Sequence, residues 1–166
     1  MQYFDLLIKT ALVCMFSDGI ADPAEIKKMS QFIDADDTTS VEARRKKMID
    51  YAAEYKADKD SFLKTYFHEL KVEELSVPEQ CQIIRCAIEV IQADESIDYS
   101  EIVLFKLVRD HLNVSDSDLV KYVPQSIDYL VRDLSKKSIT DRVKEYISSV
   151  SCENLTCSLE ELHNKE

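Results

Sequence analysis

The chain has 166 residues, of which 32 are acidic and 21 basic, so its formal net charge is −11. A field of this sign repels phosphate backbones and anionic lipid head groups, and we therefore expect no nucleic-acid partner and no membrane-surface partner. One glycine and three prolines are too few for a sheet built from tight turns, so the composition predicts a single-domain, all-α protein.

The sequence also indicates the location of the protein and the state of its cysteines. It opens without a basic segment and contains no transmembrane-length apolar run, so we expect no membrane insertion and a cytoplasmic location. Cys14, Cys81 and Cys86 lie within apolar helical patterns, which predicts buried, reduced thiols. The two Cys-x4-Cys spacings differ from those of common zinc sites, and we expect no zinc site.

Apolar residues recur at helical spacing along most of the chain. We predict helices over about residues 4–17, 22–33, 41–56, 58–70, 77–91, 98–112, 115–123, 127–134 and 139–150. The helix over residues 77–91 is apolar around most of its circumference, which indicates a central position. The tail from residue 151 is polar, with one short apolar pattern at residues 159–162.

Strong helix boundary signals surround residue 20. Gly19 suits the left-handed conformation that often follows a helix end. Asp22 is then a natural N-cap, with Pro23 at the first helical position and Glu25 completing a capping box. Further along, a run of four basic residues at positions 44–47 covers the whole circumference of a helix, and we interpret it as solvated rather than as a binding patch.

An internal repeat relates the two parts of the chain. When the sequence is shifted by 76 residues, Ile8 falls on Ile84 and Asp18 falls on Asp94. Both copies carry the motif Asp-x-x-x-Asp-x-x-Glu between two apolar helical patterns. The repeat predicts two helical hairpins with pseudo-two-fold symmetry, bridged by the helices between them.

This repeated motif, at residues 17–25 and 93–101, resembles that of the TerB family of tellurite-resistance-associated proteins. The same fold occurs in the N-terminal domain of DjlA-type membrane co-chaperones. The resemblance covers roughly residues 1–114, with departures at Ser17, Ile20 and Glu95. It implies a TerB-like bundle of about seven to nine helices, formed by a core (1–114), a C-terminal helical extension packed on that core (115–150) and a polar tail (151–166).

The resemblance further implies a stress-associated module that works through protein complexes, with an acidic surface for divalent cations. The candidate metal ligands are the acidic residues of the two motifs: Asp18, Asp22, Glu25, Asp94, Asp98 and Glu101. Their carboxylate oxygens suit Ca²⁺ or Mg²⁺. The alternative is that Asp22 and Asp98 cap helices, with Glu25 and Glu101 reaching back to the cap.

Catalytic motifs do not stand out. The sequence contains no nucleophile elbow, phosphate-binding glycine loop or His-Glu-x-x-His motif, and its one Glu-x-x-His pair, Glu160 with His163, lies in the tail. Asp110-His111 reverses the His-Asp order of helical phosphohydrolases, and we interpret His111 as a charge near a helix C-terminus. We therefore expect a non-enzymatic binding or scaffold module. The alternatives are a co-chaperone-like interaction module without metal and, with less support, a metal-dependent hydrolase. The sequence leaves the oligomeric state open.

Overall fold

The structure is a computed structural model that describes residues 2–17, 19, 22–35, 39–93, 97, 99–129 and 138–150. These residues form α-helices and one 3₁₀ helix, and the described ranges contain no strand. The elements are α1 (Gln2–Met15), α2 (Pro23–Asp34), α3 (Val41–Ala57), α4 (Lys59–Val72), α5 (Val77–Ile91), α6 (Tyr99–His111), α7 (Asp116–Tyr122), the 3₁₀ helix η1 (Pro124–Tyr129) and α8 (Ile139–Ser149). The all-α prediction is confirmed.

Short polar side chains set where most of these helices begin. Five N-cap residues each accept a hydrogen bond from the backbone N–H three positions further on: Ser40, Asp58, Ser76, Ser115 and Ser138. Each bond satisfies a donor that the first turn of a helix leaves without an intrahelical partner. At α5 the cap is a full capping box, because Glu79 also accepts from the backbone of Ser76.

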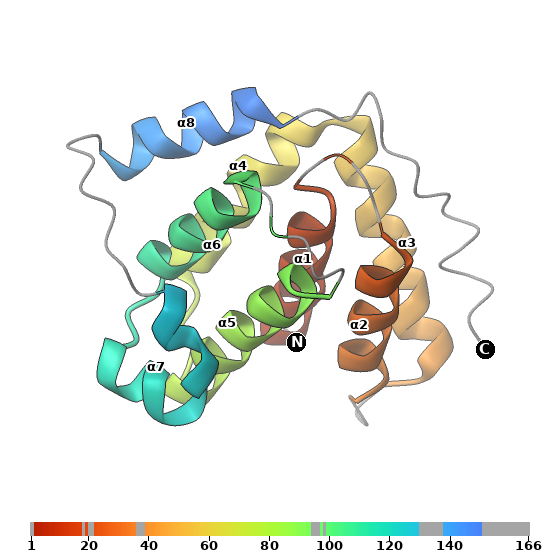
Figure 1. Cartoon of the computed structure of the whole chain (residues 1–166). Coiled ribbons are helices and arrows are strands. Elements are labelled where there is room, and N and C mark those ends of the chain that lie inside the picture. Colours follow the sequence, from red (N-terminus) through yellow and green to blue (C-terminus); the bar gives the residue numbers. More distant parts are fainter. Residues whose placement is uncertain are drawn as a thin grey trace.

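Two central helices organise the bundle. α1 and α5 pack against each other at its centre, with α2 and α3 on one side, α6 and α7 on the other, and α8 across the top of the view (Figure 1). α1 contacts α2, α5 contacts α6, and the two pairs also touch through α2 with α5 and α1 with α6. The predicted pair of helical hairpins is therefore present, and α3 and α4 connect them.

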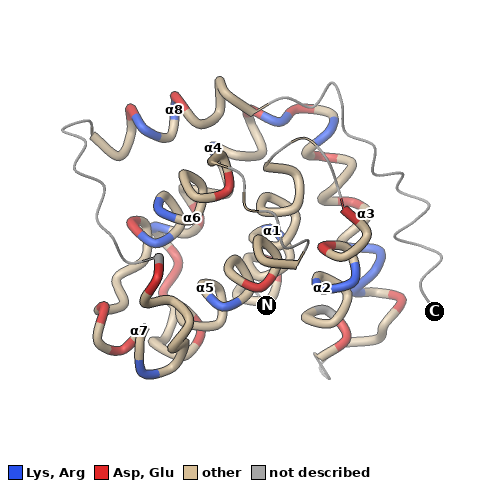
Figure 2. The backbone as a smooth tube through the Cα atoms, in the orientation of Figure 1, with Lys and Arg blue, Asp and Glu red and all other residues tan. Residues whose placement is uncertain are grey.

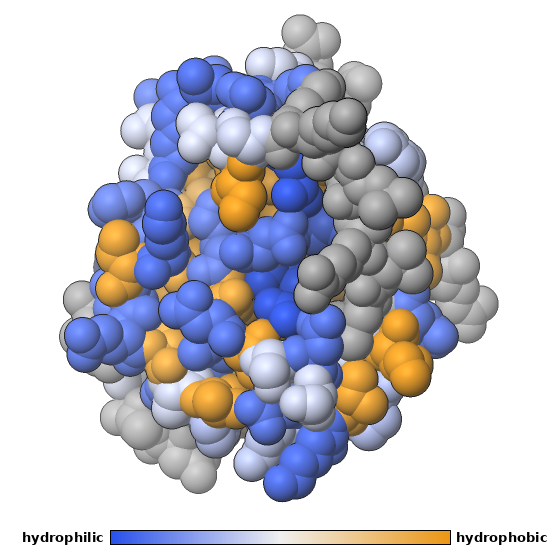
Figure 3. Space-filling model, turned by 90° about the vertical axis from the view of Figure 1, so that its left-hand side faces the viewer, coloured by the Kyte–Doolittle hydropathy of each residue, from blue (hydrophilic) through white to orange (hydrophobic). Residues whose placement is uncertain are grey.

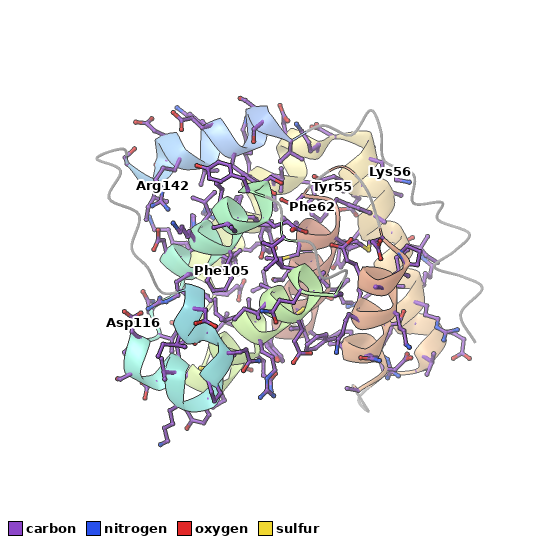
Figure 4. The ribbon with its side chains drawn as sticks, viewed as in Figure 1. Tyr55, Lys56, Phe62, Phe105, Asp116 and Arg142 are labelled. Carbon is purple, nitrogen blue, oxygen red and sulfur yellow. The ribbon has the colours of Figure 1, made fainter. Side chains whose placement is uncertain are left out.

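The core is continuous and almost wholly apolar. α5 buries side chains on most of its circumference, as its pattern predicted. At the junction of α3 and α4, the rings of Tyr55 and Phe62 meet edge to face with centroids 5.5 Å apart (Figure 4). Phe16 at the end of α1 packs on Tyr55 at 5.1 Å, so the end of the first hairpin helix is fixed by aromatic contacts.

The C-terminal elements pack on the bundle. α7 and η1 contact α5, and α8 contacts α4 and α6. Lys59 at the start of α4 donates to the carbonyl of Ile147 at 2.7 Å and to that of Val150, which ties down the end of α8. At its start, the predicted helix over residues 127–134 is replaced by the 3₁₀ helix η1. The chain forms a 3₁₀ turn after Pro124, which leaves Ile127 61% exposed, while the rest of that predicted helix lies outside the described residues.

Charged residues of both signs are distributed over the helices (Figure 2). The basic run at residues 44–47 is less solvated than predicted. Arg44 is buried on the inner face of α3, and its guanidinium donates to the carbonyl of Thr39. Lys47 forms an ion pair with Asp5 of α1 at 2.6 Å. On the face shown in Figure 3, hydrophobic side chains form separate patches among hydrophilic ones.

No helix in the described part of the chain has the length and apolar character that a membrane span requires.

Candidate functional site

The first acidic turn joins α1 to α2. Gly19 adopts a φ of 80°, the left-handed conformation predicted for it. Asp22 accepts a hydrogen bond from the N–H of Ala24 through Oδ1 at 2.7 Å, and Glu25 accepts from the N–H of Asp22 through Oε2 at 3.0 Å. These bonds are those expected for helix capping, so one oxygen of each carboxylate is engaged by the backbone of α2.

The glutamate of each acidic motif is buried. Glu25 on α2 is 0% exposed and Glu101 on α6 is 1% exposed, although both belong to turns at the ends of helices. Burying a carboxylate is costly without compensating contacts, so each must be held by polar groups around it. The repeat in the sequence thus produces two buried carboxylates at equivalent places in the two hairpins.

The thiol of Cys14 on α1 is fully buried. Burial raises the pKa of Cys14 well above its usual range, and Cys86, Glu101 and Glu25 raise it further. Cys14 therefore stays a protonated thiol, and its burial agrees with the prediction.

Two hydrogen bonds between hydroxyl groups flank the same stretch of α1. Thr10 Oγ1 and the phenol oxygen of Tyr66 are 2.8 Å apart, and Ser17 Oγ lies 2.8 Å from the phenol oxygen of Tyr146. All four residues are buried. The first bond joins α1 to α4, and the second joins the start of the acidic turn to α8. Tyr66 of α4 and Tyr146 of α8 therefore hold the hydroxyl groups of α1 and of the first acidic turn in place.

The predicted metal ligands fall into two groups. Asp22, Glu25 and Glu101 are placed by the structure, whereas Asp18, Asp94 and Asp98 lie outside the described residues. Within the described ranges, no three His, Cys, Asp or Glu side chains come together in a way that would hold a metal ion. Asp22 and Glu25 therefore fit a helix cap by themselves, and a cation site would require the three remaining aspartates as ligands.

The Asp110-His111 pair does not form a catalytic unit. Asp110 accepts from Arg142 of α8 at 2.7 Å, while Nδ1 of His111 lies 2.6 Å from the carbonyl of Leu107. Burial lowers the pKa of His111 below its ordinary value, so the ring is neutral near pH 7 and is not the helix-end charge that we predicted. Its ring packs on Phe67 instead, with centroids 5.1 Å apart. Glu160 and His163 lie outside the described residues.

A groove lies near the N-terminal end of α1. It has a volume of about 700 Å³ and is lined by residues of α1, α2, α3 and α5 together with residues of the α2–α3 connection. Tyr3, Phe4 and Leu7 of α1 and Phe32 of α2 supply its larger apolar side chains. Tyr3, Phe4 and Phe32 are only partly buried.

Residues 6–122 match the family model of the tellurite resistance protein TerB. The chain belongs to the TerB family. The match includes both acidic motifs and extends through α7, whereas α8 lies beyond it. No match to a curated protein or to a solved structure was found.

Family membership supports part of what the resemblance implied. TerB domains are helical and in general non-catalytic, and the family is associated with tellurite resistance. The all-helical bundle described above agrees with this assignment.

Proposed function

We propose that this TerB domain is a non-enzymatic binding module of the stress response associated with its family, and that it acts by holding a protein partner. The groove along α1, α2, α3 and α5 is the observation that carries this proposal. It has the size of a binding site and is lined by partly buried aromatic side chains.

Site-specific photo-crosslinking in cells tests this function. A photoreactive phenylalanine analogue at Gln82, an exposed residue that lines the groove, should yield a discrete protein adduct. The matched control carries the analogue at Ser148, which is exposed on α8 away from the groove. Equal adducts from both positions, or none from Gln82 with and without tellurite, would refute the proposal.

Binding of a divalent cation is the second candidate function. It is supported by the two buried glutamates, Glu25 and Glu101, one from each acidic motif. Together with Asp18, Asp22, Asp94 and Asp98, they offer the carboxylate oxygens that Ca²⁺ and Mg²⁺ prefer. The cation would then stabilise the turns that begin α2 and α6. An interaction module without metal, of the co-chaperone-like kind, is the alternative.

The thermal midpoint in chelator and in millimolar Ca²⁺ or Mg²⁺ separates these two possibilities. A ligand at about 100 times its Kd adds about 2.7 kcal/mol, which shifts the midpoint of a domain of this size by several degrees. The shift should disappear when Asp18→Asn and Asp94→Asn are combined. It should persist in a control that removes the same charge at exposed positions, Glu74→Gln with Asp128→Asn. If no cation shifts the midpoint, the metal proposal is wrong and partner binding stands alone.

A further inference from the structure

The charges that line the groove differ in how they are engaged. Lys47 pairs with Asp5 at 2.6 Å, and Glu89 pairs with Lys28 at 3.8 Å. Glu79 accepts from the backbone and side chain of Ser76, at 2.8 and 2.9 Å. Lys47 thus joins α3 to α1 and Glu89 joins α5 to α2, whereas Glu79 caps its own helix.

Arg85 is the exception. This half-buried residue of α5 lines the groove, and it forms no ion pair or hydrogen bond with any residue that the structure describes. Its Nε is buried and has no acceptor. The same nitrogen of Arg109 also lacks an acceptor, but the Arg109 guanidinium pairs with Asp116 at 2.6 Å. The guanidinium of Arg85 can therefore bind a partner's acceptor group, and it lies in a groove lined by apolar side chains.

We propose, building on the partner-binding function above, that the groove receives an amphipathic helix of the partner protein whose carboxylate side chain pairs with Arg85. Tyr3, Phe4 and Phe32 then cover the apolar stripe of that helix. Arg85 fixes its register, because one carboxylate must lie opposite the guanidinium.

Three physical arguments favour this occupant. A donor buried without an acceptor is unfavourable, so a carboxylate that reaches Arg85 relieves a cost that the free protein carries. The planar guanidinium also binds a carboxylate through two parallel hydrogen bonds, which selects both a charge and an orientation. Finally, a groove between helices with an apolar floor and a charged flank is the usual receptor for a helix with apolar residues at i, i+3, i+4 and i+7.

The net charge of −11 restricts the rest of the partner. An overall acidic protein would be repelled before contact, so the helix should belong to a neutral or basic protein and carry its carboxylate beside the apolar stripe. Electrostatic attraction at long range and the local pair at Arg85 then act on different parts of the partner.

A displayed library of amphipathic helices tests the proposal with the full-length chain. Each helix has a leucine stripe, a lysine-rich outer face and randomised positions beside the stripe. Selection on the natural chain should enrich Asp or Glu at one flanking position, and selection on Arg85→Glu should enrich Lys or Arg at that same position. The enriched peptide should lose at least tenfold in affinity on Arg85→Gln, as expected for loss of a partly buried ionic hydrogen bond. It should bind Lys106→Gln normally, since Lys106 lies on α6 outside the groove.

Several results would overturn the inference. An enriched helix without a charge preference, or one that binds Arg85→Gln normally, removes the proposed pair while leaving the partner-binding function intact. Failure to enrich any helix removes the helical occupant. If Leu159→Ser with Leu162→Ser raises the affinity for the enriched peptide tenfold, the chain's own tail is the natural occupant of the groove. Self-association that is lost in Arg85→Glu would assign it to a second copy.

Discussion

The hydrogen bond between Ser17 and Tyr146 makes it possible to measure how much the packing of α8 contributes to the stability of the fold. Its two oxygens are 2.8 Å apart, and the residues are 3% and 2% exposed. In Tyr146→Phe, the ring keeps its edge contact with Phe67, so the main loss is the hydroxyl group. The Ser17 hydroxyl is then buried without this partner, which should cost about 1–3 kcal/mol of unfolding free energy. The thermal midpoint should fall by about 2–4 °C for each kcal/mol.

The corresponding double-mutant cycle isolates the bond. Ser17→Ala leaves the Tyr146 hydroxyl without its partner and should cost a similar amount. The double variant leaves neither group orphaned, so its loss should be smaller than the sum of the single losses by about 1–2 kcal/mol. Urea unfolding with an unchanged dependence on denaturant measures each value. Strictly additive losses would refute the reasoning and show that the two hydroxyls do not depend on each other.

Three further outcomes follow from the turns and from α6. Gly19→Ala should destabilise the protein by about 1–2 kcal/mol in urea unfolding, because φ is 80° there; an unchanged midpoint would contradict that conformation. Asp22→Ala should cost about 1 kcal/mol by the same assay, whereas Asp22→Asn should retain most of the cap, so equal losses would argue against capping. Burial lowers the pKa of His111, so the unfolded chain binds more protons and stability should decline as pH falls below 6.5. His111→Gln should flatten that decline between pH 7 and 5, and an identical pH profile would exclude His111 as a contributor.

Helix positions followed directly from the sequence because the signals are local. The spacing of apolar residues along α1, α2 and α5 agrees with the predictions. The capping box of Ser76 with Glu79 was missed, although the pattern Ser-x-x-Glu was present before an apolar run.

The sequence also indicated, in part, which charged residues are buried. Arg44 is in step with Met48, Ala52 and Tyr55 on the inner face of α3, a face visible as an i, i+4, i+8, i+11 series. Reading residues 44–47 as one basic run hid that periodicity. In the same way, Glu101 is in step with Leu104, Phe105 and Val108 of α6, so its position pointed to the core. Arg85 and the groove had no such signal, because they depend on how α5 sits against three other helices.

The burial of the glutamates changes how the acidic motifs should be tested. Glu25 accepts a backbone hydrogen bond at the start of α2 and is 0% exposed, so its substitution would disturb folding whether or not a cation binds. A loss of metal response in a Glu25 variant would therefore not identify a ligand. The aspartates Asp18 and Asp94 occupy turn positions that sequence reasoning did not assign to a cap, and replacing them with Asn retains side-chain oxygen while removing charge. A cation response that these replacements abolish, in a chain that still unfolds at its normal midpoint in chelator, would separate ligation from the structural role of the buried glutamates.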